Sequence, residues 1–394
     1  MYRRLVFAAV QNPSFQEASA ALAELGEVTL LPKRIWRAAK RIGQERVAER
    51  RAAAQAYVAL DLPAQQRSPV AAASQLVCVQ MDGGRYQHRD RAADDQAVTA
   101  EADRGDSHWR EFKAGCLLTM TSQTYAADPC PQLPPGFADP GHMRKIAREI
   151  KGFTQQEKQE THSQEEEQAH EKDRAGRPQV LVRSVVATTA TVRPFGELLA
   201  SAAYERGFHA APRKAFVADG AEANWGVQQR HFSHYTPILD FVHALMYVYA
   251  AAMCQGEAAG WKRYRDWSQW LWSGHVTRVI DALLKWQREL GLPEEKEAGT
   301  PRAQVAETLR YLRHHAQRMK YAEYRCQGLP ITSSHIESTV KQINRRMKGT
   351  EKFWSDADPL LHLVADRLSQ TNATSDFWRR RTNRPASHCY HQSL

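Results

Sequence analysis

The chain contains 394 residues, of which 42% are hydrophobic and 25% are charged. These values are ordinary for a soluble globular protein and exclude wholesale disorder and a collagen-like fibre. Lys and Arg total 54 against 44 Asp and Glu, which gives a formal net charge of +10, so a polyanion such as nucleic acid is the expected partner. The cysteines show no CxxC spacing and no apolar run is long enough to span a membrane. We therefore expect a cytoplasmic protein without a zinc ribbon, a disulfide scaffold or a membrane span.

Residues 1–55 are predicted to be helical, with the pattern of a small helix-turn-helix-like DNA-binding region. Ser14 and Glu17 have capping-box spacing at the start of one helix, which Gly26 ends, and Pro32 opens a second helix. Basic side chains crowd the second helix and are candidates for DNA contacts: Lys33, Arg34, Arg37, Lys40 and Arg41. A solvated basic helix packed on a neighbour explains this loose pattern about equally well.

The rest of the chain alternates between β-rich and helical patterns after an Ala-, Pro- and Gln-rich linker at 56–72. A polar insert occupies about 125–180, and a Trp-rich segment at 244–328 has helical spacing. A further helical segment at 329–380 precedes a basic tail at 381–394. Short strands are predicted at 76–81, 109–121, 181–187, 214–218 and 236–240, with a helix at 195–206.

Acidic residues stand where three predicted strands end. Asp82 and Asp219 each precede a glycine, and Asp240 ends the last strand. Two such carboxylates on adjacent strands can hold Mg²⁺, and a pair of metal ions stabilises the attacking and leaving oxygens of phosphoryl transfer. Taken singly, each Asp-Gly pair is more simply a turn. Asp240 is more simply an N-cap and His243 a core or surface histidine, and the functional alternative is that both orient the site.

Glu337 is the candidate for a third carboxylate, in the helix after Pro330. Ser334 and Glu337 also match a capping box, in which the carboxylate merely holds the helix start. An apolar stripe follows, and beside it a row of cations suited to a phosphate backbone next to a metal site, or to a solvated surface. The expected DNA contacts here are Lys341, Arg345, Arg346, Lys348 and Lys352.

The segment from Gly328 to Trp354 (GLPITSSHIESTVKQINRRMKGTEKFW) resembles the third motif of DDE transposases of bacterial insertion sequences, of the ISKra type. These enzymes have an RNase H-like core and are related to the Mutator-like group. The strings Gln80–Gly84 (QMDGG) and Val217–Glu222 (VADGAE) resemble the first and second Asp motifs. Ile238–His243 resembles the Asp-x-x-His signature, and the likeness spans about residues 76–380 in the same order.

This resemblance implies an α/β fold: an RNase H-like mixed-sheet catalytic core at 73–243 and 329–380, interrupted by an all-α insertion at 244–328. It implies that Asp82, Asp219 and Glu337 bind Mg²⁺ or Mn²⁺. The sequence contains no Walker loop and no GxGxxG string, so no nucleotide cofactor is expected. The implied activity is cleavage at insertion-sequence ends and strand transfer into target DNA. The implied partners are double-stranded DNA, at both the element ends and the target, and at least a second copy of the chain; the protein would be nucleoid-associated.

Two other functions fit the same sequence. One is a catalytically inactive, transposase-derived DNA-binding protein, for which the basic composition and the helical N-terminal region would suffice. The other is an RNase H-like DNA nuclease or resolvase, which hydrolyses DNA without joining strands.

Overall fold

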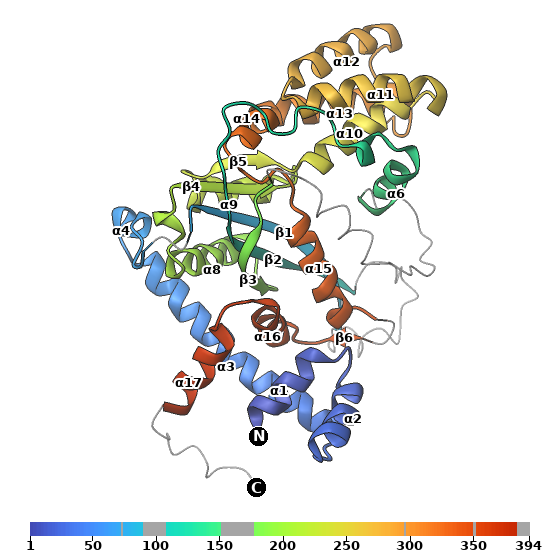
Figure 1. The fold of residues 1–394 in the computed structure, drawn as a ribbon. Helices are drawn as coiled ribbons and strands as arrows, with labels where there is room; N and C mark the ends of the chain where they lie inside the picture. Colours follow the sequence, from blue (N-terminus) through green and yellow to red (C-terminus); the bar gives the residue numbers. More distant parts are fainter. Residues whose placement is uncertain (72–73, 90–107, 151–176, 295–296, 350–351, 384–394) are drawn as a thin grey trace.

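The computed structural model describes residues 1–71, 74–89, 108–150, 177–294, 297–349 and 352–383 (Figure 1). Its architecture is mixed α/β, as predicted. A central sheet has helices on both faces, a group of helices from α10 to α14 lies beyond the β5 edge, and α1 to α3 lie at the opposite end (Figure 1).

The sheet contains both parallel and antiparallel strands in the order β3-β2-β1-β4-β5, with β6 paired to the end of β1. β1 is antiparallel to β2, and β2 to β3, whereas β1, β4 and β5 run parallel. The predicted strands are therefore confirmed. Their bounds are β1 Leu76–His88, β2 Trp109–Met120, β3 Val180–Thr188, β4 Arg213–Ala218, β5 Thr236–Leu239 and β6 Phe353–Trp354.

β1 does not end at Asp82, and this corrects both the predicted strand end and the hairpin turn considered there. The strand continues through Asp82 to His88, with Asp82 opposite Ala114 of β2. Gly84 allows this pairing, because a Cβ at that position would lie 2.2 Å from the Cζ atom of the Phe112 ring. Asp82 is thus held inside a paired strand rather than at a turn.

The N-terminal region is helical, and its first helix boundaries are as predicted. α2 begins after Ser14, whose hydroxyl accepts from the Glu17 N–H at 3.1 Å, and ends at Gly26. The second helix of the predicted pair is much longer than expected. It ends at Val58, inside the predicted linker at 56–72, and a further short helix follows within that segment. The bounds are α1 Tyr2–Gln11, α2 Phe15–Gly26, α3 Pro32–Val58 and α4 Leu62–Gln66.

Buried ion pairs join α3 to α16 (Asp358–Leu368). Arg46 Nε and Arg50 Nη2 lie 2.7 and 2.6 Å from the two carboxylate oxygens of Asp366. Gly43 packs directly on α16, since a Cβ there would lie 2.4 Å from the Pro359 carbonyl oxygen. α3 also packs on α8 (Val192–Glu205), so it is part of the body of the fold.

The segment predicted to be all-α is helical, beginning at Phe241. Part of the predicted polar insert packs on it: Phe137 is buried, and the Tyr264 hydroxyl donates to the Phe137 carbonyl at 2.8 Å. The rest of that insert, 151–176, lies outside the described residues. The bounds are η1 Pro135–Ala138, α6 Pro140–Ile150, α10 Phe241–Met253, α11 Glu257–Trp272, α12 Val276–Leu290, α13 Pro301–His315, η3 Ala316–Arg318 and α14 Tyr321–Cys326.

Helices α15 and α8 cover opposite faces of the sheet. Cys116 of β2 faces Thr339 of α15 (Sγ to Oγ1, 3.3 Å), whereas a Cβ on the preceding Gly115 would lie 2.6 Å from Leu199 of α8. Alternation along a strand explains this division. The remaining helices are η2 Phe208–Ala210, α9 Glu222–His231, α15 Ser334–Met347 and α17 Ala373–Asn383.

Two further features bear on the sequence predictions. Residues 381–383 of the predicted basic tail belong to α17, where Arg381 pairs with Glu45 of α3 at 2.6 Å; residues 384–394 lie outside the described chain. Among the helices that the structure describes, none is long and apolar enough to cross a membrane.

Candidate metal centre

The register of the two parallel strands brings Asp82 level with Asp219. Gln80 of β1 pairs with Val217 of β4. Asp82 follows Gln80 by two residues, and Asp219 follows Val217 by two residues. The Gly83 N–H donates to Asp82 Oδ1 at 2.6 Å. Both side chains are partly buried, and the register places the two residues at the same level, Asp82 within β1 and Asp219 directly after β4.

Asp219 is also oriented by the turn that leads into α9. Its Oδ1 accepts from the Ala221 N–H at 3.0 Å and from Asn224 Nδ2 at 2.7 Å. Asn224 is a site residue that the sequence interpretation missed. Its position in the sequence could have identified it: Asn224 is five residues after a strand-end aspartate, in the first turn of the following helix, from where its amide can reach that aspartate.

Glu337 approaches from α15, and its carboxylate does not cap that helix. The N-cap is Ser333 rather than Ser334, so the capping box considered for Ser334 and Glu337 is absent. Instead, the Ser333 hydroxyl donates to Glu337 Oε1 at 2.8 Å. Ser333 is a second residue that the sequence interpretation missed, although it belongs to the visible Thr-Ser-Ser run.

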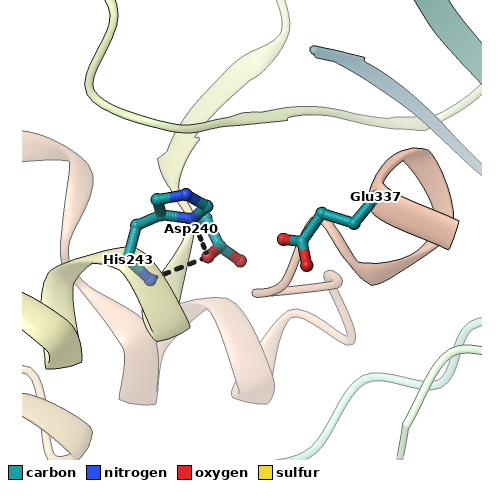
Figure 2. A group of neighbouring side chains, drawn as sticks. All are labelled: Asp240, His243 and Glu337. Atoms are coloured by element: carbon teal, nitrogen blue, oxygen red, sulfur yellow. Dashed lines mark hydrogen bonds and ion pairs between the residues drawn. The ribbon is translucent and has the colours of Figure 1, made fainter. Parts of the chain in front are cut away.

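Figure 2 shows the Glu337 carboxylate facing a pair formed by Asp240 and His243, and the ligand atoms of these three residues all lie within 4.8 Å of one another. Asp240 is fully buried. Its Oδ2 accepts from the His243 backbone N–H at 2.9 Å and from its Nδ1 at 2.7 Å, and its Oδ1 accepts from the Ser333 N–H at 2.8 Å. Asp240 is therefore the N-cap of α10, as the simpler interpretation held, and it also ties His243 and α15 to this group.

Asp82 and Asp219 lie outside that closest group, within the part of the chain that the structure describes, but their charges act on it. Burial raises the pKa of Asp82 to about 6; the Gly83 N–H opposes this rise, and the charges of Asp219 and Asp240 add to it. Burial and the charges of Asp240 and Asp82 likewise raise the pKa of Glu337, against the opposing effects of His243 and Ser333. The charge of Asp219 thus acts on Asp82, and the charge of Asp82 acts on Glu337.

His243 is the cation of this site. Burial lowers its pKa, but the hydrogen bond and charge of Asp240, together with the charges of Glu337 and Asp219, outweigh burial and raise the pKa to about 9. Without a metal ion, this pKa leaves the His243 imidazole protonated at neutral pH beside the carboxylates.

The donor set fits a hard divalent cation. Carboxylate oxygens are the ligands that Mg²⁺ and Mn²⁺ prefer. Of the three predicted ligands, Glu337 belongs to the group whose donor atoms lie within 4.8 Å of one another in the described part of the chain, and Asp82 and Asp219 do not. The pKa values of Asp82 and Glu337 are raised first by burial and then by neighbouring carboxylate charges. A divalent cation bound beside these carboxylates would favour their ionised forms.

The predicted DNA-contacting residues of α15 divide into exposed and buried ones. Lys341 and Arg345 are exposed on the helix, and Lys348 is exposed at its C-terminal cap. Lys352 lies beyond the end of the helix and donates to the Arg345 carbonyl at 3.3 Å, so the helical spacing assumed for it is wrong.

Arg346 is not on the surface, which corrects its inclusion among the DNA contacts. It is 5% exposed, its Nε donates to the Ala9 carbonyl at 3.0 Å, and its guanidinium lies 4.5 Å from the centroid of the Phe15 ring. It links α15 to the N-terminal helices.

The basic residues of α3 are mostly exposed. Lys40 is half-buried, with its ammonium 3.2 Å from Asp356. The exposed members of the set are Lys33, Arg34, Arg37 and Arg41.

Comparison of the chain with protein-family models and with curated proteins gave no match.

Proposed function

We propose that the chain is a DDE transposase, which cleaves DNA at the ends of an insertion sequence and joins the freed ends to target DNA. The observation that supports this most directly is that the three acidic residues are carried by β1, the end of β4 and α15, with the ligand atoms of Glu337, Asp240 and His243 within 4.8 Å of one another. The charge of Asp219 acts on Asp82, and that of Asp82 acts on Glu337. Asp82 lies in β1, Asp219 directly follows the neighbouring strand β4, and Glu337 follows an all-α segment. An RNase H-like core with a helical insertion is expected to have this arrangement.

Asp82, Asp219 and Glu337 would hold Mg²⁺ or Mn²⁺. A bound metal pair supplies charge stabilisation for the attacking and leaving oxygens of phosphoryl transfer. The chain's own contribution is to fix the three carboxylates on rigid elements and to keep His243 protonated beside them through Asp240. The exposed cations Lys341 and Arg345 continue along α15 from Glu337, where the phosphate backbone of a bound duplex would run.

The proposed reaction has two balanced steps at phosphorus. In cleavage, a water oxygen bonds to phosphorus while the bond to the 3′ oxygen breaks, which leaves a 3′-OH on the element and a 5′-phosphate on the flanking DNA. In strand transfer, that 3′ oxygen bonds to a target phosphorus while the target's own bond to its 3′ oxygen breaks. The second step exchanges one phosphodiester for another, so it needs no energy source. Two ends must react together, so a homodimer or larger assembly on DNA is part of the proposal.

A strand-transfer assay tests this function. The full chain is incubated with the DNA that flanks its own coding sequence, a supercoiled target and Mg²⁺. We expect cleaved ends and joined products with the wild type. Asp219→Asn and Glu337→Gln should lose both products and keep DNA binding, because removing a metal ligand impairs chemistry more than docking. Glu222→Gln removes an exposed carboxylate near Asp219 and serves as the control with normal activity.

The other outcomes separate the alternatives. Cleavage without joining would indicate a nuclease or resolvase. Salt-dependent DNA binding without any metal-dependent cleavage would indicate a DNA-binding protein without catalysis. Normal cleavage by both ligand variants would refute the assignment of the carboxylates.

A further inference from the structure

Gln80 is a fully buried polar side chain in an otherwise apolar stretch of β1. Its Nε2 donates to the Thr332 carbonyl at 2.9 Å, and its Oε1 accepts from the Ile336 N–H at 3.2 Å. A buried amide is costly unless its polar atoms are bonded, and here both bonds go to the start of α15. We infer that Gln80 is a positioning residue, which fixes Glu337 relative to Asp82; this inference rests on the proposed function.

Gln80 links the strand that carries Asp82 to the helix that carries Glu337. Gln80 precedes Asp82 by two residues, so both side chains project from the same face of β1. Ile336 immediately precedes Glu337. The two hydrogen bonds therefore join the strand that carries one predicted ligand to the helical turn that carries another.

The first turn of α15 depends on such outside contacts. The N-cap Ser333 makes no side-chain bond to the helix backbone, although the first N–H groups of a helix need acceptors. The Ile336 N–H is shared between the Ser333 carbonyl at 3.0 Å and Gln80. Asp240 accepts from the Ser333 N–H on the other side, so side chains from β1 and from the end of β5 hold the same turn.

The chain contains a matched control for this interaction. Gln228 of α9 is also buried, at 5% exposed, and its Nε2 donates to the carbonyls of Phe232 and Tyr235 at 3.0 and 3.3 Å. It has the same chemistry and comparable burial, and these bonds go to the loop before β5 rather than to α15. Gln80→Met and Gln228→Met remove the same kind of amide.

The test measures Mn²⁺ binding to the full chain by electron paramagnetic resonance, together with amide exchange over residues 332–340. Loss of residues that orient metal ligands lowers metal affinity by about 10- to 100-fold, and we expect a change of that size for Gln80→Met with faster exchange of the segment. Turnover should fall with an unchanged KM for DNA. Gln228→Met should bind Mn²⁺ within about twofold of wild type. If Gln80→Met folds poorly, Gln80→Asn takes its place in the test. Asparagine keeps the amide on a shorter side chain, so we expect the same defect in a milder form.

The results distinguish failure of the inference about Gln80 from failure of the proposed function. Wild-type Mn²⁺ affinity and exchange in Gln80→Met, or equal losses in both Met variants, would overturn the role of Gln80 and leave the proposed function standing. Failure of the wild type itself to bind Mn²⁺ would refute the proposed function and the inference together.

Discussion

Replacing Asp82 by Asn is expected to stabilise the metal-free protein at neutral pH. Burial raises the pKa of this carboxyl from 3.8 to about 6, so the folded state disfavours the ionised form that the unfolded chain adopts freely. At about 1.4 kcal/mol per pH unit, this difference corresponds to roughly 3 kcal/mol of destabilisation when the group is fully ionised. Asparagine occupies a similar volume without the charge, so the variant should recover an appreciable part of that free energy.

The pH dependence follows from the sign of the shift. Between about pH 4 and 6 the folded state binds more protons at Asp82 than the unfolded state does, so wild-type stability falls as the pH rises through that window. The advantage of Asp82→Asn should therefore be nearly absent below about pH 4 and fully present above about pH 6. Mg²⁺ binds only the folded site, so it should stabilise the wild type and narrow the gap.

The assay is urea unfolding of both proteins across this pH range, with and without Mg²⁺. Asp281→Asn changes an exposed aspartate on α12 and should alter the free energy of unfolding by less than about 0.5 kcal/mol at every pH. The reasoning from buried charge is wrong if Asp82→Asn is less stable than wild type at neutral pH without metal. It is also wrong if the variant exceeds wild-type stability by the same amount at low pH as at neutral pH.

Three further predictions concern packing and charge around the site. Gly220→Ala should cost about 1–3 kcal/mol in urea unfolding, because its Cβ would lie 2.3 Å from Tyr311 Cε2; failure of Tyr311→Ala to relieve the loss would contradict this cause. Asp366→Ala leaves the buried Arg46 and the largely buried Arg50 of α3 without this carboxylate and should cost about 3–5 kcal/mol in the same measurement, whereas a loss below about 1 kcal/mol would argue against a buried network. The His243 proton should titrate near pH 9 by NMR, contributing stability that is present below about 6.5 and lost as the pH rises through about 9. Asp240→Asn should lower that midpoint, and an ordinary wild-type midpoint would refute the pairing.

Local sequence signals were sufficient to predict most of the strands. β2, β3 and β4 are runs of apolar and β-branched residues bounded by polar segments, so they are recognisable within a short window. The continuation of β1 past Asp82 was not predictable in this way. It depends on Phe112, whose ring fills the space beside Gly84 and which belongs to a different strand.

Contacts between residues far apart in the sequence also decide which parts of the site could not be predicted. The spacing of Asp240 and His243 shows that the aspartate can cap the helix and reach the histidine, and the structure has both contacts. The burial of Arg346 depends on Ala9 and Phe15 at the other end of the chain. Helical spacing places Arg345 opposite the apolar stripe of α15 and Arg346 at its flank, three residues after Ile343, but nothing within 334–347 identifies the distant residues that cover Arg346.

The central claim is that Asp82, Asp219 and Glu337 share divalent cations. Its most direct test is an anomalous difference map, recorded at the manganese edge, from crystals of the full chain grown with Mn²⁺. We predict density between roughly 2.0 and 2.4 Å from carboxylate oxygens of all three residues. A map with no peak among them, or with a peak held only by Asp240 and His243, would contradict the claim.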